Sequence, residues 1–208
     1  MKKFLPVLFA FVLASCSTVR QEGIASQTSQ ASHTDQQKKF NYKVHVTNAK
    51  TMNLMLPENM DGSVDRVYLF VGDFGNRSFI APLYFTSDSQ GMYISILNDL
   101  GTSLAELSFS ETGVDFDSEL LPGKMGKMKA EYIVSDIQAA FYNVDALKDH
   151  YRNSGLLFET HPAGNGEVRV VMDGKKVIMT ITKDENIVCI KNFLRGYSYE
   201  LTGAKDDD

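Results

Sequence analysis

The sequence predicts a mainly β fold of the α+β class: a curled antiparallel sheet, or unclosed β-barrel, of about ten strands with two short helices as lid or plug. Short apolar runs separated by clusters of turn residues fill most of the chain, as in an antiparallel meander. In residues 130–155 the hydrophobic period changes to about 3.6, which is typical of helices. Many strand segments are apolar at adjacent positions, so both of their faces need cover.

The N-terminus has the layout of a secretory signal peptide. Lys2 and Lys3 precede an apolar run over residues 4–14, which is too short to cross a bilayer as a permanent helix. Small residues then mark a cleavage site, so residues 1–15 are predicted to be removed. An uncleaved anchor is an alternative that the sequence leaves open.

Cys16 stands directly after this signal peptide, and Leu13, Ala14 and Ser15 precede it. This order resembles the bacterial lipobox, whose cysteine receives a diacylglycerol and becomes the acylated first residue after cleavage. More than one acyl chain on a residue anchors a protein stably to a membrane. By the same resemblance, Ser17 in place of Asp implies the cell outer membrane, with the domain facing the periplasm. A plain secretory signal beside an unmodified cysteine is the other alternative.

Length and charge fit one domain behind a flexible tether. Of the 208 residues, 43% are hydrophobic and 23% are charged, as in ordinary globular domains. Residues 16–38 hold hardly any large apolar side chain and are predicted to form the tether. Residues 39–203 are expected to form the domain, and residues 204–208 an acidic tail. The formal charge of −5 argues against a nucleic-acid partner.

Apolar runs place the strands in chain order. Residues 40–46 alternate apolar or aromatic with polar side chains, which is the period of a half-buried strand, and a second strand at residues 52–56 ends at Pro57. Turn clusters separate the next strands, which are predicted at residues 67–71, 78–85, 92–97, 104–109 and 114–116. After the helical segment, strands are predicted at residues 156–160, 168–172, 177–182, 187–190 and 197–201.

The helical segment predicts two short helices. Ile133, Ile137 and Phe141 fall on one face at helical spacing, and this face is expected to pack on the sheet. Asn143 is suited to cap a second helix, and Gly155 is suited to end it.

The sequence contains no recognisable catalytic or metal-binding constellation. The four histidines lie apart, without partners at metal-ligand spacing, so no metal and no cofactor is expected. Asp115 and Asp117 flank Phe116; a pair of hydrolytic carboxylates is one interpretation, and the exposed face of a strand is the favoured one. Cys189 has no disulfide partner once Cys16 is acylated, and it is predicted to be buried and inert rather than a reactive thiol. The protein is therefore not expected to be an enzyme.

Three stretches resemble known families. Residues 98–107 (NDLGTSLAEL) resemble a strand of LolB-type proteins. Residues 131–142 (EYIVSDIQAAFY) and 190–201 (IKNFLRGYSYEL) are similar to a helix and the final hairpin of an uncharacterised family of bacterial outer-membrane lipoproteins. That family is commonly encoded with aryl-polyene pigment genes. The resemblance implies the LolA and LolB fold, an unclosed antiparallel barrel whose helices cover a hydrophobic cavity.

Such a cavity implies a hydrophobic acylated ligand: a lipid, a lipoprotein acyl chain or an aryl-polyene lipid. The side chains expected to line it are Phe79, Leu83, Phe85, Tyr93, Ile96 and Leu107 from the sheet, and Ile133, Ile137 and Phe141 opposite them. Met125 and Met128 add adaptable side chains near the helices. A dry, packed core is the alternative to a cavity.

One departure from LolB bears on the function. In LolB an apolar residue on a hairpin loop helps to deliver lipoproteins into the membrane, and the corresponding residues 86–91 are wholly polar here. The sequence therefore favours an outer-membrane lipoprotein that holds or transfers a ligand over one that inserts it. The alternative is a scaffolding lipoprotein without a ligand, which contacts an envelope protein through its sheet edge or helices.

Replacing Cys16 with Ser tests the anchor. A serine cannot form the thioether to diacylglycerol, so Cys16→Ser protein is expected to leave the membrane fraction and appear in the periplasmic extract. Fractionation and immunoblotting measure the distribution, and Cys189→Ser, which leaves the lipobox intact, is the control. Membrane association of Cys16→Ser as strong as that of the wild type would contradict the lipid anchor.

Overall fold

The computed structural model describes residues 41–75, 77–121 and 128–203. Within these ranges, ten strands form one antiparallel sheet and two more form a separate hairpin. The predicted signal peptide, the lipobox residues 13–16, the tether and the acidic tail lie outside the described residues, and so does Met125.

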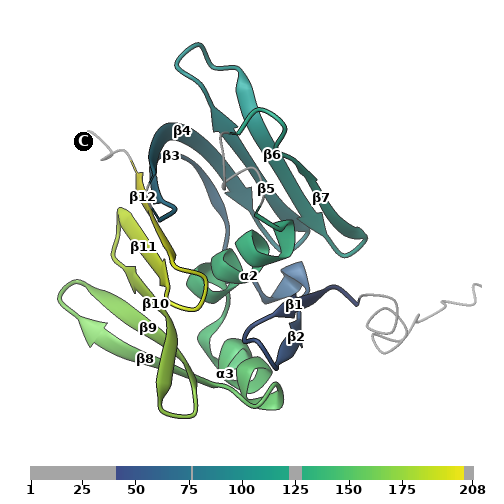
Figure 1. The fold of residues 1–208 in the computed structure, drawn as a ribbon, viewed down its shortest axis with the longest axis vertical. Helices are drawn as coiled ribbons and strands as arrows, with labels where there is room; N and C mark the ends of the chain where they lie inside the picture. Colours follow the sequence, from purple (N-terminus) through teal and green to yellow (C-terminus); the bar gives the residue numbers. More distant parts are fainter. Residues whose placement is uncertain (1–40, 76, 122–127, 204–208) are drawn as a thin grey trace, which may run out of the picture. The chain divides into compact units, whose positions relative to one another are not determined.

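Two halves of the chain build the sheet (Figure 1). The first half supplies β3 (Val64–Asp73), β4 (Ser78–Ser87), β5 (Gly91–Leu97), β6 (Ser103–Ser110) and β7 (Gly113–Asp117). The second half supplies β8 (Leu157–Ala163), β9 (Gly166–Asp173), β10 (Lys176–Lys183), β11 (Ile187–Asn192) and β12 (Tyr197–Gly203). The strand order is β7-β6-β5-β4-β3-β12-β11-β10-β9-β8. Because β7 and β8 are opposite edges, the sheet is not closed into a barrel.

A single strand pair joins the two halves of this sheet. β12 lies antiparallel beside β3, with Leu201 opposite Phe70 and Tyr199 opposite Gly72. All other neighbours in the sheet are consecutive along the chain, as hairpins with short turns require. The inner face of the sheet is therefore continuous only because the last strand pairs with one of the first.

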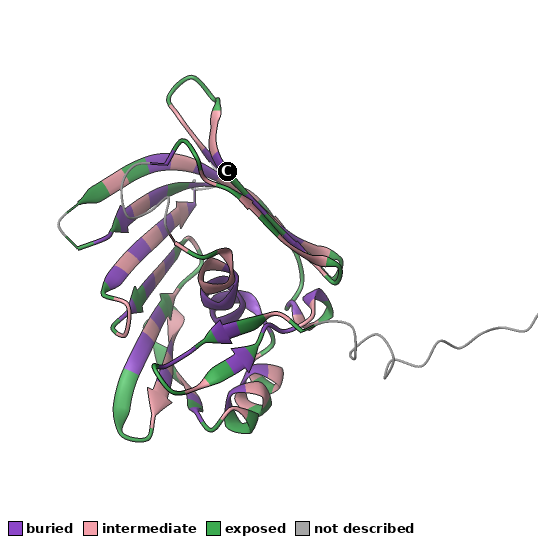
Figure 2. Cartoon of the chain, turned by 45° about the vertical axis from the view of Figure 1, so that its right-hand side comes forward, coloured by how far each residue is buried: buried purple, intermediate pink, exposed green. Residues whose placement is uncertain are grey.

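Burial alternates along the strands and gives the sheet an inner and an outer face (Figure 2). In β12, Tyr197, Tyr199 and Leu201 are buried, and the residues between them are partly exposed. β4 alternates in the same way from Ala81 to Ser87. The side chains of the inner face belong to one hydrophobic cluster with those of the helices.

Helices α2 (Ala130–Phe141) and α3 (Val144–Asn153) connect β7 to β8. α2 lies on the concave side of the curled sheet, where it packs against β7, β10 and β11 (Figures 1 and 2). Residues 134–141 of α2 are buried, whereas residues 130–133 are partly exposed. α2 thus occupies the concave side of the sheet and covers part of its inner face. α3 packs against β8. No helix among the described residues is long and apolar enough to cross a membrane.

Two cations from the second half of the sheet hold the C-terminal end of α2. Arg169 on β9 is 3% exposed, and its Nη1 donates to the carbonyl oxygens of Ala139 at 3.0 Å and Tyr142 at 3.1 Å. Its remaining nitrogens bind the Glu167 carboxylate. Lys183 on β10 donates to the carbonyl of Ala140 at 3.5 Å. The last carbonyls of a helix lack partners within it and carry the negative end of its dipole, so these cations stabilise the end of α2.

Further polar contacts fix the helices. The buried Gln138 amide accepts a hydrogen bond from the Met55 amide at 3.0 Å and donates one to the Met55 carbonyl at 2.8 Å. The predicted cap of α3 is confirmed, because the Asn143 side chain accepts hydrogen bonds from the amides of Asp145 and Ala146. Gly155 follows the helix with a φ of 72°, a conformation that glycine adopts without strain.

The first two strands differ from the expectation. β1 (Lys43–His45) and β2 (Thr51–Asn53) pair with each other in a hairpin and are not part of the large sheet. The second strand stops before residue 56, and a 3₁₀ helix, η1 (Pro57–Asn59), follows. Pro57 has the fixed φ that suits the first position of a helical turn, which explains why the strand does not continue.

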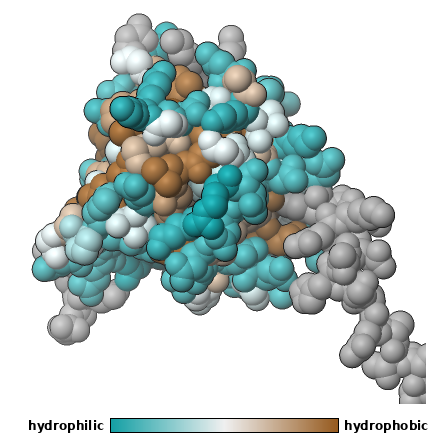
Figure 3. Space-filling model, turned by 90° about the horizontal axis from the view of Figure 1, so that it is seen from below, coloured by the Kyte–Doolittle hydropathy of each residue, from teal (hydrophilic) through white to brown (hydrophobic). Residues whose placement is uncertain are grey.

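Some large hydrophobic side chains remain at the surface. On the outer face of β3 and β4, Val67 is 53%, Leu69 is 48% and Ile80 is 66% exposed. Figure 3 shows the face seen from below, where hydrophobic residues gather at the centre and hydrophilic residues surround them. Val67, Leu69 and Ile80, which lie on two neighbouring strands, are a candidate for a contact surface.

The predicted fold class is confirmed: the structure is mainly β, with an unclosed antiparallel sheet and two helices in the described part of the chain. Every predicted strand has a counterpart in the structure. Most of the observed strands are a few residues longer, because the ladder of backbone hydrogen bonds continues into the polar residues beside the turns.

Removing the clamp on α2 is expected to destabilise the protein strongly. Arg169→Ala leaves helix carbonyls and the Glu167 carboxylate without their partner, which costs roughly 3–5 kcal/mol for a buried charge pair. Arg152, whose side chain is 72% exposed and binds Asp149 on the surface of α3, is the matched control. Arg152→Ala should cost less than about 1 kcal/mol. Urea unfolding measures both, and equal losses for the two variants would contradict the role assigned to Arg169.

Candidate functional site

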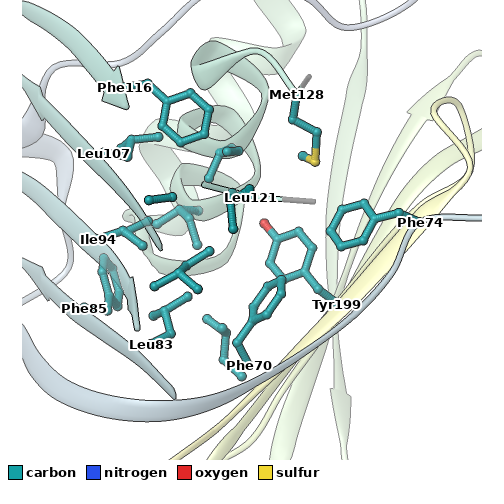
Figure 4. Close-up of a pocket in the computed structure, with 15 residues that line it drawn as sticks. Phe70, Phe74, Leu83, Phe85, Ile94, Leu107, Phe116, Leu121, Met128 and Tyr199 are labelled. Carbon is teal, nitrogen blue, oxygen red and sulfur yellow. The ribbon is translucent and has the colours of Figure 1, made fainter. Parts of the chain in front are cut away.

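The inner face of the sheet and α2 enclose an apolar cavity of about 50 Å³ (Figure 4). Strands β3 to β7 and β12 form one wall, α2 forms the opposite wall, and side chains next to these elements complete it. The lining residues are Phe70, Phe74, Leu83, Phe85, Ile94, Ile96, Ala105, Leu107, Phe116, Leu121, Met128, Ile133, Ile137, Tyr199 and Leu201.

Six of the nine predicted lining residues border this cavity: Leu83, Phe85, Ile96, Leu107, Ile133 and Ile137. The other three lie elsewhere. Phe79 is partly buried at the far end of β4 and packs against Phe70, with ring centroids 6.2 Å apart. Phe141 lies at the clamped end of α2 and packs against Phe85, with ring centroids 5.1 Å apart. Met128 does line the cavity.

The placement of Tyr93 needs correction. Tyr93 lies between the buried Met92 and Ile94 and packs against Tyr84 on the outer face, with ring centroids 6.3 Å apart. Successive side chains of a strand point to opposite faces, so residues 93 and 96 cannot both face one cavity in a regular strand. Ile94 takes the place that was expected for Tyr93.

Reasoning from the sequence misses the part of the wall that β3 and β12 provide. Phe70, Tyr199 and Leu201 belong to it. The alternation of residues 197–201 indicates which of these side chains share a face. Nothing in the sequence indicates that this face meets β3, because the pairing of β12 with β3 joins residues far apart in the chain.

The cavity is suited to an apolar group but is small in this conformation. Ligand pockets of proteins usually measure about 300–1,000 Å³, so the cavity of about 50 Å³ has to widen before an acyl chain can enter. In the first turn of α2, residues 130–133 are partly exposed and Lys129 gives the helix no side-chain cap, so the Arg195 guanidinium on the Tyr132 ring is the main side-chain contact of this end. Ile133 and Ile137 are the side chains that would move with this end.

A buried carboxyl group lies beside the cavity, on the same helix. Asp136 is 2% exposed, and its Oδ2 accepts a hydrogen bond from the Tyr197 hydroxyl at 2.5 Å. The Asn192 side-chain amide donates to Oδ1 at 3.4 Å. Burial raises the pKa of Asp136 to about 6, although the Tyr197 bond and the positive charge of Arg195 act in the opposite direction. Asp136 therefore titrates near neutrality and links α2 to β11 and β12.

The remaining sequence candidates lie apart from the cavity. Asp115 and Asp117 are exposed on β7, where they flank the half-buried Phe116. Cys189 is half-buried rather than buried, because it faces outward on β11, and its thiol donates to the Glu200 carboxylate at 3.1 Å. Burial and this carboxylate raise the pKa of the thiol to about 11, which disfavours a reactive thiolate. No cluster of three or more His, Cys, Asp or Glu side chains suited to a metal occurs among the described residues.

A second, polar groove of about 440 Å³ lies between the η1 region and α3. Asn53, Glu58, Asp149 and His150 are among its lining residues. The His150 ring binds the Asn53 carbonyl at 2.7 Å, so this side chain already has a structural partner. The polar lining makes the groove unsuited to the hydrophobic ligand expected from the sequence.

Comparison with known proteins identifies one family. Residues 70–203 match a family described as protein of unknown function, DUF3261. The match covers more than half of the chain and includes β12 and the C-terminal end of β3. No curated protein matches the sequence.

The pKa of Asp136 implies a dependence of stability on pH. The ordinary pKa of this carboxyl is 3.8, and in the folded protein it is about 6. Between these values the folded state binds a proton that the unfolded state has lost, so the free energy of unfolding falls as the pH rises. The stabilisation is fully present below about pH 4, amounts to roughly 2–3 kcal/mol, and is lost by about pH 6.

Asp136→Asn, which cannot titrate, is expected to remove this dependence. Urea unfolding between about pH 4 and pH 7 should show the wild type losing roughly 2–3 kcal/mol relative to the variant. Asp149→Asn, at a carboxylate that is 70% exposed on α3, is the control and should follow the wild type. A constant difference between the wild type and Asp136→Asn across this range would exclude titration of Asp136 on unfolding.

Proposed function

The chain belongs to the DUF3261 family of proteins of unknown function, and from the geometry of its cavity we propose that it binds or transfers a hydrophobic acylated ligand. In this proposal the protein is an outer-membrane lipoprotein, anchored through Cys16 and facing the periplasm. The ligand is a lipid, a lipoprotein acyl chain or an aryl-polyene lipid, and it occupies the space between the curled sheet and α2.

The observation that carries the proposal is the composition of the cavity wall. Of the lining side chains, Tyr199 alone has a hydroxyl and none is charged, although the walls come from six strands and a helix. A protein of this size can fill its core with large side chains, yet Ala105 on β6 presents only a methyl group to the cavity. The wall is thus apolar where an acyl chain would need it to be.

The two ends of α2 differ in their contacts with the rest of the protein, and this difference supports entry of an acyl chain. Arg169 and Gln138 fix the C-terminal half of the helix, whereas its first turn carries no cap and is partly exposed. A ligand can therefore displace Ile133 and its neighbours without undoing the clamp. The apolar surface that the acyl chain buries then offsets the apolar surface that α2 no longer buries when Ile133 moves.

The resemblance of residues 98–107 to a strand of LolB-type proteins supports the same class of ligand, and one loop limits the proposal to holding or transfer. The turn between β4 and β5 contains Asp88, whose carboxylate accepts hydrogen bonds from the amides of Gln90 and Gly91. This compact polar turn presents no apolar side chain to a bilayer. Delivery of the ligand into the membrane is therefore not part of the proposal.

A second candidate is a scaffolding lipoprotein that carries no ligand. The outward Val67, Leu69 and Ile80 favour it, because exposed apolar side chains on neighbouring strands are typical of contact surfaces. Copurification of one defined envelope protein with a protein that is free of lipid would support this candidate over the first.

Detergent-free purification of Cys16→Ser protein from the periplasmic extract, where loss of the anchor is expected to place it, tests the proposal directly. Mass spectrometry of a solvent extract is expected to find an acyl or polyene ligand in stoichiometric amount. A protein that is empty in repeated preparations would count against ligand binding.

Filling the cavity supplies a variant for the same test. Ala105→Leu places extra volume at the β6 wall, and forcing a ligand in beside it costs roughly 1–3 kcal/mol, so binding of diphenylhexatriene, a fluorescent hydrocarbon, should weaken about tenfold. Ala81→Leu is the matched control, since Ala81 is equally buried on β4 but does not line the cavity. Equal weakening in both variants would show that the effect comes from overpacking and not from a filled binding site.

A further inference from the structure

We propose that the outer face of β3 and β4 is a docking surface for a second protein, whose contact region carries apolar side chains surrounded by lysine and arginine. This surface lies on the side of the sheet opposite the cavity, so the inference does not rest on the proposed ligand. It also goes beyond the scaffolding candidate, because it states the chemistry of the partner.

The apolar centre of the surface consists of two facing rows of outward side chains on neighbouring strands. The register pairs Val67 with Tyr84, Leu69 with Pro82 and Val71 with Ile80. The Cβ atoms of directly opposed residues in an antiparallel pair lie about 4.5–5.5 Å apart, so these side chains form one contiguous area, the β3–β4 patch. Its most exposed members are Val67, Leu69 and Ile80.

The fold itself does not require apolar side chains at the β3–β4 patch. α2 packs on the concave, inner side of the sheet, and a face of an antiparallel sheet that is turned to water ordinarily carries polar side chains (Figure 2). The outer face of β6 and β7 does so, with Glu106 beside Asp117 and Ser108 beside Asp115. The β3–β4 patch departs from this rule in the interior of the sheet, between β5 and β12. A partner that covers the patch accounts for the difference.

The charged side chains around the β3–β4 patch are all acidic. The structure describes every outward position of β3 to β7 and of β12, and the charged residues at these positions are Asp65, Asp73, Glu106, Asp115, Asp117 and Glu200. In the strand order, the first outward cation among the described residues is Lys191, on β11. An apolar centre with a charged rim is the usual arrangement of a protein–protein interface.

This acidic rim determines which partner fits the surface. Two copies of the chain that met through this face would bring their carboxylates together, and a bilayer of anionic lipids would be repelled in the same way. A protein surface with lysine and arginine around apolar side chains complements both the rim and the centre. Its positive charges would attract the rim during the approach, and burial of the β3–β4 patch would supply the affinity.

Photo-crosslinking in the native envelope shows what covers the patch. In the full chain, p-benzoylphenylalanine replaces Leu69, or Leu157 on β8 as the matched control, since these two leucines are 48% and 46% exposed. Position 69 is expected to give a product with one other protein that position 157 does not give. A product with a second copy of this chain or with lipid would overturn the inference, as would the same result at both positions.

The captured protein supports the inference only if it binds as the surface predicts after both proteins are purified. Leu69→Ser should weaken binding roughly fivefold, because less apolar surface is buried, and Leu157→Ser should not weaken it. Between about 0.1 M and 1 M salt the Debye length falls from about 10 Å to about 3 Å, so the affinity should fall at least about tenfold. Titration calorimetry measures both effects, and urea unfolding checks that the variants are folded.

Neutralising the rim tests the charge of the partner. Asp73→Asn combined with Asp115→Asn should slow association several-fold and reduce the salt dependence. Asp145→Asn combined with Asp149→Asn is the control, at carboxylates that are 90% and 70% exposed on α3, and should do neither. An affinity that does not change with salt, or equal effects of the two double variants, would overturn the inference.

These outcomes are independent of the proposed ligand, because none of the substituted residues lines the cavity. A protein without a bound ligand would count against the proposed function and leave this inference in place.

Discussion

The docking of α2 inside the curled sheet is the constraint on which the rest of the structure depends. The sheet has two free edges, β7 and β8, and the helices form the connection between them. An open sheet with an apolar concave face is stable only when another element covers that face. Arg169 holds the C-terminal end of α2 through the Ala139 carbonyl. Gln138 binds the helix to the backbone of Met55, which precedes η1.

These contacts are distributed unevenly along α2, and the cavity lies where they are weakest. The C-terminal half of α2 is buried and clamped, and its first turn is partly exposed and uncapped. A helix held at one end can open at the other while the rest of the fold stays intact. Asp136 lies between the two regions and holds the middle of the helix to β11 and β12 through Asn192 and Tyr197. The same helix thus stabilises the fold and bounds the space proposed for the ligand.

Local features of the fold could be predicted from the sequence, and long-range ones could not. Patterns among neighbouring residues predict the strands, the start of the helical segment near residue 130 and the Asn143 cap. The structure contains all three. In the sequence, Arg169 alternates with apolar residues like an exposed residue of a strand. In the structure it is buried, because α2 packs over it and the Ala139 carbonyl accepts its hydrogen bond. The contribution of Tyr199 to the cavity requires the pairing of β12 with β3, and no local pattern encodes that pairing. The choice of Tyr93, in contrast, could have been avoided by counting positions along β5.

The small volume of the cavity fits the proposed ligand binding, because a ligand carrier has to be stable both without and with its ligand. A permanently open apolar space of ligand size would expose the inner face of the sheet, whereas here about 50 Å³ remains unfilled. An entering chain then exchanges its own apolar contacts for those of the first turn of α2. Since the two burial contributions are similar, much of the hydrophobic gain cancels, and affinity depends on the smaller differences that remain.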